Sequence, residues 1–309
     1  MELMDLLYFF ESIRTPVLNI IGEVISFFGS ETFLLILMGI IFWCVDKELG
    51  YKMAFSYVVA GTVNNVLKLA LRISRPWVRD TSFSAVESAK STATGYSFPS
   101  GHANNIGVIG TSLIMNTRYT WLKIVALVMM IMVPISRMYL GVHTIFDVIA
   151  GLGLGILITI IVNKVMSGTS TDTRSLSPIM FALMLFPLAL IIVALAFYYN
   201  GYVEYENMAD AVKSSGAFFG IIIGWYIERT KVHFNVRCSR YWKQILKLIL
   251  GFAVVFIIKV GLKELFLLIG EEFWPGDFIR YFLMTFFAIG IYPMIIKKLF
   301  SSKIGYDRM

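Results

Sequence analysis

Residues 120–163 read TWLKIVALVMMIMVPISRMYLGVHTIFDVIAGLGLGILITIIVN, which is two long apolar runs separated by a short polar segment. An α-helix needs about 20 mostly apolar residues to cross the hydrocarbon core of a bilayer. Each run therefore predicts a transmembrane helix. The segment between the runs carries Arg137, His143 and Asp147, so we expect a polar cluster where these two helices reach the membrane surface.

The composition of the whole chain is typical of a membrane protein. Hydrophobic residues make up 58% of the 309 residues and charged residues 15%, and the mean hydropathy is +0.75. An ordinary soluble domain is about 45–50% apolar, so that class is excluded. The acidic start, with Glu2 and Asp5, lacks the basic region of a secretory signal, and we expect no cleaved targeting peptide. Cys44 and Cys238 lie in different contexts and imply no disulfide framework.

The apolar runs predict an all-α, polytopic transmembrane helical bundle of about nine spans. The candidates lie near residues 31–46, 52–72, 102–117, 120–136, 143–164, 178–199, 210–228, 244–269 and 278–298. Before them, residues 3–13 and 16–28 mix apolar side chains with Glu11, Arg14 and Glu23 at near-helical spacing. We expect these two segments to form interfacial amphipathic helices.

Basic residues are concentrated in alternate loops. Lys47, Lys123 and Arg229 represent the loops of one side, together with the tail after Lys297, whereas the loops near residues 200–210 and 271–277 contain acids and no Lys or Arg. Cytoplasmic loops are the ones that retain positive charge during insertion. The basic side is therefore expected to be cytoplasmic. This distribution assigns the net charge of +7 to the membrane surface and predicts no nucleic-acid partner.

Two cations and a proline form a first polar cluster at the end of the second predicted span. Lys68 and Arg75 are seven residues apart, which is two helical turns, so both are expected to point from one helical face towards a single anion. Pro76 disfavours helical geometry at Arg75. We expect the helix to end there, with Arg75 over the mouth of a site.

A second cluster, Pro99-Ser100-Gly101-His102, directly precedes the third predicted span. Unpaired backbone N–H groups and the helix dipole favour an anion at such a helix start. Gly101 permits close approach of the backbone, and Ser100 can donate its hydroxyl. The plainer alternative is that Ser100 only caps the helix, which explains neither His102 nor Pro99.

The third cluster places a carboxylate one helical turn after a histidine. His143 and Asp147 are four residues apart at the start of the fifth predicted span, a spacing at which their side chains can touch. Asp147 is expected to fix the tautomer of His143 and leave the other ring nitrogen as a lone pair, as a nucleophile requires. Arg137 adds a planar fork that matches phosphoryl oxygens.

Written as KxxxxxxRP, PSGH and SRxxxxxHxxxD, the three clusters resemble the signature of the type 2 phosphatidic acid phosphatase superfamily over residues 50–165. The resemblance implies that His143 attacks phosphorus to give a phosphohistidine, and that His102 protonates the leaving oxygen and then activates water. It implies no metal and no cofactor. The implied phosphate-binding residues are Lys68, Arg75, Ser100, Gly101 and Arg137.

The predicted function is therefore an integral membrane phosphatase whose substrate is a lipid phosphate or diphosphate, hydrolysed on the extracellular or luminal side of a cell membrane. Polyprenyl diphosphates, phosphatidate-like lipids and sphingoid phosphates all fit. The alternatives are a lipid phosphotransferase that uses the same phosphohistidine, a sugar phosphatase similar to glucose-6-phosphatase, and a transporter or scaffold with a relic site. The sequence does not predict the oligomeric state.

The predicted organisation has three parts. Residues 1–30 form the interfacial helices, residues 31–165 the phosphatase catalytic core, and residues 166–309 additional transmembrane helices with a basic tail. Within the last part, Lys259, Lys263 and Glu264 fall inside an apolar run. We expect a structural ion pair or snorkelling there rather than chemistry.

Overall fold

The computed structural model describes residues 4–168, 173–237 and 241–300, and within these ranges every regular element is helical. The elements in chain order are α1 (Asp5–Ser12), α2 (Pro16–Phe27), α3 (Glu31–Ile40), the π-helical turn η1 (Ile41–Val45), α4 (Lys47–Leu71), α5 (Pro76–Arg79), α6 (Glu87–Lys90), α7 (Gly101–Asn116), α8 (Thr120–Tyr139), α9 (Ile145–Gly168), α10 (Thr173–Ala182), α11 (Leu185–Tyr199), α12 (Tyr205–Ile227), the π-helical turn η2 (Glu228–Val232), α13 (Tyr241–Leu267), α14 (Trp274–Phe286), the π-helical turn η3 (Phe287–Ile291) and α15 (Tyr292–Leu299). The predicted all-α class is confirmed for this part of the chain.

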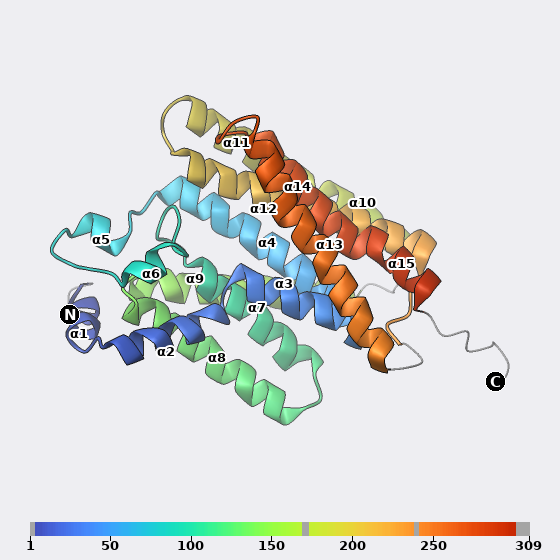
Figure 1. Ribbon diagram of the computed structural model, residues 1–309, viewed down its shortest axis with the longest axis horizontal. Helices are drawn as coiled ribbons and strands as arrows, with labels where there is room; N and C mark the ends of the chain where they lie inside the picture. Colours follow the sequence, from blue (N-terminus) through green and yellow to red (C-terminus); the bar gives the residue numbers. More distant parts are fainter. Residues whose placement is uncertain (1–3, 169–172, 238–240, 301–309) are drawn as a thin grey trace.

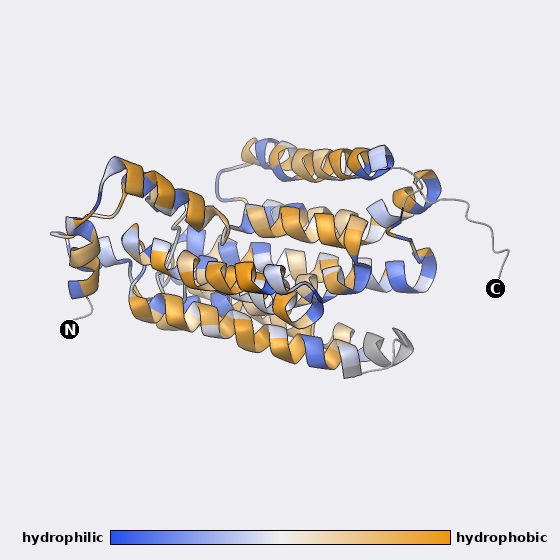
Figure 2. Ribbon diagram, turned by 90° about the horizontal axis from the view of Figure 1, so that it is seen from below, coloured by the Kyte–Doolittle hydropathy of each residue, from blue (hydrophilic) through white to orange (hydrophobic). Residues whose placement is uncertain are grey.

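The long helices lie roughly side by side and form one elongated bundle (Figure 1). The short helices α1, α5 and α6 gather at one end of the bundle, and α15 lies at the other end. Apolar residues dominate the long helices, as Figure 2 shows. The end with α5 and α6 is also where α4 and α8 finish and where α7 and α9 begin, so the three polar clusters lie at the same end.

Six of the described helical segments are long and apolar enough to cross a membrane. They are Lys47–Arg79, Thr120–Tyr139, Ile145–Ser167, Pro178–Tyr199, Tyr241–Leu267 and Trp274–Leu299. The predicted count of nine stays a prediction, because α7 and α12 do not meet this criterion. α7 has 16 residues, about 24 Å of helix. α12 carries charged residues and is largely buried by protein, so it needs no lipid-compatible surface.

The N-terminal helices α2 and α3 form a bent pair. Residues 16–27 and 31–45 meet at 45° and are together long and apolar enough to count as a seventh span. The side chain of Thr15 caps α2, and that of Ser30 caps α3 by accepting from the N–H of Phe33 at 3.2 Å. The predicted interfacial segment 16–28 is thus a helix that continues, after a break, into the predicted first span.

The region that carries the three polar clusters is assembled by close packing of α4, α7, α8 and α9. α7 lies against both α8 and α9, and α4 lies against α7, α9 and α12. Asp46 starts α4 by accepting from the backbone N–H groups of Glu48 and Leu49 at 2.8 and 3.1 Å. The later helices form a second layer in which α12 packs along α14. α4 therefore stands between the two layers and contacts both.

Candidate active site

Lys68 lies in the last turn of α4, whereas Arg75 lies beyond the end of that helix. α4 ends at Leu71, and Arg72 follows in the left-handed conformation with a φ of 49°. Arg75 is extended and precedes α5, which begins at Pro76. The expectation that both cations project from one helical face is therefore wrong, because the helix stops before Arg75. The expectation that Arg75 leaves helical geometry is confirmed.

The buried guanidinium of Arg75 uses all three of its nitrogens in hydrogen bonds to other residues of the protein. Nε donates to the carbonyl oxygen of Gly95 at 3.0 Å, and Nη2 donates to that of Thr94 at 2.7 Å. Nη1 donates to the carbonyl oxygen of Val142 at 3.1 Å and lies 2.9 Å from Nε2 of His143. A guanidinium only donates hydrogen bonds. Nε2 of His143 is therefore the acceptor and carries a lone pair.

The other ring nitrogen of His143 faces Asp147. Nδ1 lies 3.6 Å from Oδ2 of Asp147, so the pair is close but longer than a good hydrogen bond. The same Oδ2 accepts from the hydroxyl of Ser97 and from the backbone N–H of Thr144, both at 2.7 Å. Because Nε2 accepts from Arg75 and Nδ1 faces a carboxylate, the arrangement favours the tautomer protonated on Nδ1.

His143 lies between the apolar segments that end at Tyr139 and begin at Ile145. Burial is the main cause that lowers the pKa of His143 well below the ordinary value, and the nearby Arg75 cation lowers it further. Asp147 acts in the opposite direction but does not reverse the shift. The imidazole is therefore neutral at pH 7, which is the state that can act as a nucleophile.

The start of α7 is pressed against α9. The hydroxyl of Ser100 accepts from the N–H of Ala103 at 3.5 Å, so the cap is present, and the N–H of Ser100 donates to the carbonyl oxygen of Asp147 at 2.9 Å. A Cβ added to Gly151 would lie only 2.3 Å from the carbonyl oxygen of Ser100. By contrast, a Cβ added to Gly101 would meet nothing within 4 Å. The backbone of Gly101 thus borders open space at a helix N-terminus.

Arg137, in the last turn of α8, is a buried cation with unused donors. It is 1% exposed. Nη1 donates to the hydroxyl of Ser26 at 2.8 Å and to that of Thr92 at 3.2 Å. Nε and Nη2 are buried and make no hydrogen bond to any residue that the structure describes. An unpaired buried charge is costly, so three N–H groups of Arg137 are available for an anion.

His102 and Lys68 complete the predicted set. His102 is the second residue of α7, and its imidazole interacts electrostatically with Arg137, His143, Arg75 and Lys68. The structure therefore places both histidines and all three cations around one volume at the α5–α6 end of the bundle.

A polar cavity of about 230 Å³ lies beside this cluster, between α3, α4, α7, α12 and α14. We call it the polar cavity. Lys68 and Gly101 line it from the predicted catalytic core, and Asp210 and Lys213 line it from α12. Asp210 and Lys213 form an ion pair at 3.2 Å. The later helices thus form one wall next to the predicted phosphate-binding residues, which the sequence alone did not indicate.

Sequence reasoning missed three hydroxyl groups around the cluster. Ser97 holds Asp147, while Ser26 and Thr92 hold Arg137. Ser97 stands two residues before the PSGH motif, and this proximity is its only sequence signal. Ser26 precedes Arg137 by 111 residues, and nothing in the sequence connects the two.

Lys259, inside the apolar segment α13, forms an ion pair with a residue of another helix. The sequence predicts a structural ion pair or snorkelling for Lys259, Lys263 and Glu264. In the structure Nζ of Lys259 lies 3.8 Å from Oε1 of Glu31, which starts α3. The predicted structural ion pair is present, but it joins two helices.

Comparisons with known proteins agree with this geometry. The PAP2 superfamily matches residues 49–170, and the PAP2 superfamily phosphatase transmembrane extension matches residues 212–303. Phosphatidylglycerophosphatase B of Bacillus subtilis is 32% identical over 167 residues, which cover 48% of this chain and 76% of that protein. The chain belongs to the PAP2 superfamily. It is a multi-pass membrane protein in which the three polar clusters fall inside the matched core.

Two other relatives match more partially. Human sphingosine-1-phosphate phosphatase 2 is 30% identical over 210 residues, or 65% of this chain and 50% of the human protein. Undecaprenyl-diphosphatase of Sulfolobus acidocaldarius is 32% identical over 111 residues, or 35% of this chain and 51% of that protein. The chain thus spans about half the length of these two curated relatives.

Proposed function

We propose that this protein is a membrane lipid phosphatase that hydrolyses a lipid phosphate monoester or diphosphate through a phosphohistidine on His143. The observation that carries the proposal is the pairing of a neutral, buried His143 with Arg137, whose Nε and Nη2 atoms have no partner among the described residues. A nucleophile with a lone pair and a cation with free N–H groups is the combination that phosphoryl transfer needs. The names of the relatives support a lipid phosphate as substrate.

In the first step, Nε2 of His143 attacks phosphorus and the bond from phosphorus to the lipid oxygen breaks. His102, which is protonated while the phosphate anion is bound, donates its proton to that leaving oxygen. Arg75 now donates to Nε2 at 2.9 Å, so this hydrogen bond is exchanged for one to a phosphoryl oxygen before the attack. Arg137 donates to the same equatorial oxygens as negative charge develops.

In the second step, water attacks the phosphohistidine. His102, which lost its proton in the first step, now accepts a proton from water. The bond from phosphorus to Nε2 breaks, inorganic phosphate leaves, and His143 returns to its neutral form. Asp147, held by Ser97 and Thr144, stabilises the positive imidazole ring that exists while Nε2 is phosphorylated.

We place this reaction on the non-cytoplasmic face. Lys47, Lys123 and Arg229 lie at the helix ends of the opposite end of the bundle, and positively charged ends of transmembrane segments stay in the cytoplasm. The cations of the cluster, Arg75 and Arg137, run against this trend because they serve the substrate.

The test of function is phosphate release from a panel of lipid phosphates and diphosphates by the purified full-length protein, with a chelator present. We expect release with a plain lipid phosphate and a rapid-quench phosphoryl adduct on the protein that is absent in His143→Ala. Transfer of the phosphoryl group to an added alcohol instead of water, or wild-type rates in His143→Ala, would reject the proposal. Activity that the chelator abolishes would reject the metal-free mechanism.

The sidedness is tested with single cysteines in a background where Cys44 and Cys238 are replaced. Ser84 is exposed in the segment between α5 and α6, and Arg118 is exposed between α7 and α8 at the opposite end. In intact cells an impermeant thiol reagent should label Ser84→Cys and leave Arg118→Cys unlabelled until lysis. The reverse pattern would overturn the orientation.

A further inference from the structure

A second cavity lies next to the polar cavity, and its residues take no part in the proposed reaction. It is a cavity of about 370 Å³ lined by α3, η1, α4, α12, α13, α14 and η3, and its lining is almost entirely apolar. We call it the apolar cavity. Its volume falls in the range of about 300–1,000 Å³ that is typical of ligand sites. None of the residues of the three sequence motifs lines it.

The two cavities follow one another along the same helices. Tyr57 of α4 lines both. On the other three shared helices the lining passes from one cavity to the next within about one turn. These pairs, with the residue of the polar cavity first, are Glu31 and Thr32, Ala217 and Ile221, and Tyr281 and Met284. The polar cavity therefore stands directly over the apolar cavity.

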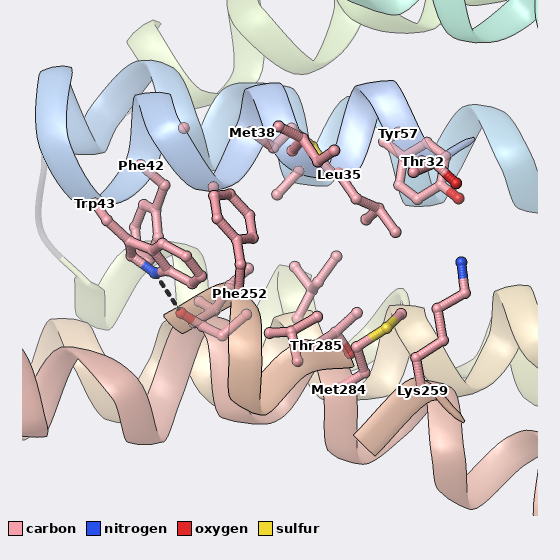
Figure 3. A pocket seen from close by; sticks show the side chains of 18 of the residues that line it. Thr32, Leu35, Met38, Phe42, Trp43, Tyr57, Phe252, Lys259, Met284 and Thr285 are labelled. Atoms are coloured by element: carbon pink, nitrogen blue, oxygen red, sulfur yellow. Dashed lines mark hydrogen bonds between the residues drawn. The ribbon is translucent and has the colours of Figure 1, made fainter. Parts of the chain in front are cut away.

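The end of the apolar cavity nearest the polar cavity is itself polar. Figure 3 shows the side-chain tips of Thr32, Tyr57 and Lys259 close together at this end. Nζ of Lys259 lies 3.8 Å from Oε1 of Glu31, and Glu31 belongs to the lining of the polar cavity. The boundary between the two cavities is thus a ring of polar groups.

The opposite end of the apolar cavity is closed by aromatic rings. Phe42, Trp43 and Phe252 gather there (Figure 3). The indole Nε1 of Trp43 donates to the carbonyl oxygen of Ala288 in η3 at 2.9 Å. The rings of Trp43 and Phe252 are 5.1 Å apart. These rings form the floor of the cavity. On α13, Phe252 of the floor lies seven residues before Lys259, which is about 10 Å along the helix.

The arrangement matches an amphiphile with one hydrocarbon chain. Cationic and hydrogen-bonding groups, including Lys68, lie at the top, and an apolar tube with a closed floor lies beneath them. α13 forms one side of the tube and is the least buried of the six apolar segments.

We infer that the apolar cavity binds the single hydrocarbon chain of the substrate whose phosphate is hydrolysed at His143, and that the rings of Trp43 and Phe252 set the preferred chain length. This inference rests on the proposed function, and it narrows the substrate class to single-chain lipid phosphates. The polar cavity then holds the atoms between the phosphate and the chain.

The test uses alkylphosphonates of increasing chain length, whose carbon–phosphorus bond is not hydrolysed, and measures their affinity for the full-length protein. Val255 lines the cavity from α13, and Val255→Trp fills it. The longest chain that still gains affinity should become shorter, with a loss of about fourfold for each methylene that the indole excludes. Phe252→Ala removes a floor ring and should move the optimum to longer chains.

The matched control is Ile257→Trp, because Ile257 lies on the same helix and is 65% exposed. It should leave the chain-length profile as in the wild type. Identical profiles in Val255→Trp, Phe252→Ala and the wild type would overturn the inference and indicate that bulk bilayer lipid fills the cavity. Phosphate release from lipid phosphates is measured in parallel. If the two variants shift the phosphonate profile as expected but no lipid phosphate is hydrolysed, the proposed function alone is rejected. If phosphate is released but the chain-length profile is the same in the variants and the wild type, the chain site alone is rejected.

Discussion

Helix α9 meets α7 through backbone atoms, whereas α13 meets its neighbours through side chains. A Cβ added to Gly151 would lie 2.3 Å from the carbonyl oxygen of Ser100, but a Cβ added to Gly251 would lie 2.7 Å from ring carbons of Trp43 and Tyr292. A ring can turn, while a backbone moves only with its helix. The helices around His143 are therefore held at fixed separations, which positions reacting groups for chemistry. The wall of the apolar cavity formed by α13 can adapt.

The largest expected decrease in kcat is at His143, in the region where α7 and α9 meet through backbone atoms. His143→Ala should lower kcat by about 10⁴-fold, by analogy with loss of a nucleophile in other enzymes, while the helix content and the thermal midpoint stay close to those of the wild type. His233→Ala is the matched control, because His233 lies at the far end after η2. A decrease of similar size in both variants would mean that histidine replacement damages the fold.

The next effect separates the two kinds of helix contact. Gly151→Ala should push α7 from α9, lower kcat about 100-fold through misplacement of Ser100 against His143, and destabilise the protein by about 1–3 kcal/mol. Gly251→Ala should change kcat by less than about threefold, since rings yield at modest cost. Gly153, at which a Cβ meets nothing within 4 Å, supplies a control on α9 itself. An equal decrease in kcat in Gly151→Ala and Gly251→Ala would show that the backbone contact and the side-chain contact are equally rigid.

A smaller effect is expected at the residue that positions Asp147. Ser97→Ala removes a hydrogen bond of 2.7 Å to a carboxylate, and bonds to charged groups contribute about 1.5–3 kcal/mol. We expect kcat to fall roughly tenfold or more, with partial rescue in Ser97→Thr, which restores a hydroxyl. Ser91→Ala, at an exposed position, is the control. An unchanged kcat in Ser97→Ala would mean that Asp147 is held well enough by Thr144 alone.

The smallest effect is spectroscopic. A histidine with a lowered pKa stays neutral until the pH falls below that lowered value, so the His143 ring should remain neutral at pH 6, below the ordinary midpoint of about 6.5. NMR of ring-labelled protein can follow its three histidines, and the signal missing from His143→Ala identifies the residue. A midpoint at or above the ordinary value would show that Asp147 outweighs burial and Arg75.

The local features of this fold could be predicted from the sequence. Apolar runs located α8 and α9, and the Pro76 rule correctly removed Arg75 from helical geometry. The four-residue spacing of His143 and Asp147 correctly predicted that their side chains are neighbours. Each of these inferences depends on residues within one or two helical turns.

The remaining features depend on contacts between segments far apart in the chain. Saturation of the Arg75 guanidinium by Thr94 and Gly95 needs the path of a loop, and the Lys259 pair with Glu31 joins residues more than 200 positions apart. The end of α4 before Arg75 was missed because nothing in the local sequence marks Leu71 as a terminus. The boundaries predicted at residues 30 and 165 stay predictions.

The hydrogen bond from Arg137 to Ser26 extends the functional unit beyond the matched segment. The family match begins at residue 49, yet the hydroxyl of Ser26 in α2 accepts from this arginine at 2.8 Å. A chimera that transplanted only residues 49–170 into a relative would inherit the arginine with Thr92 but without its Ser26 acceptor. The module that recombination can exchange intact must therefore include the bent N-terminal pair as well.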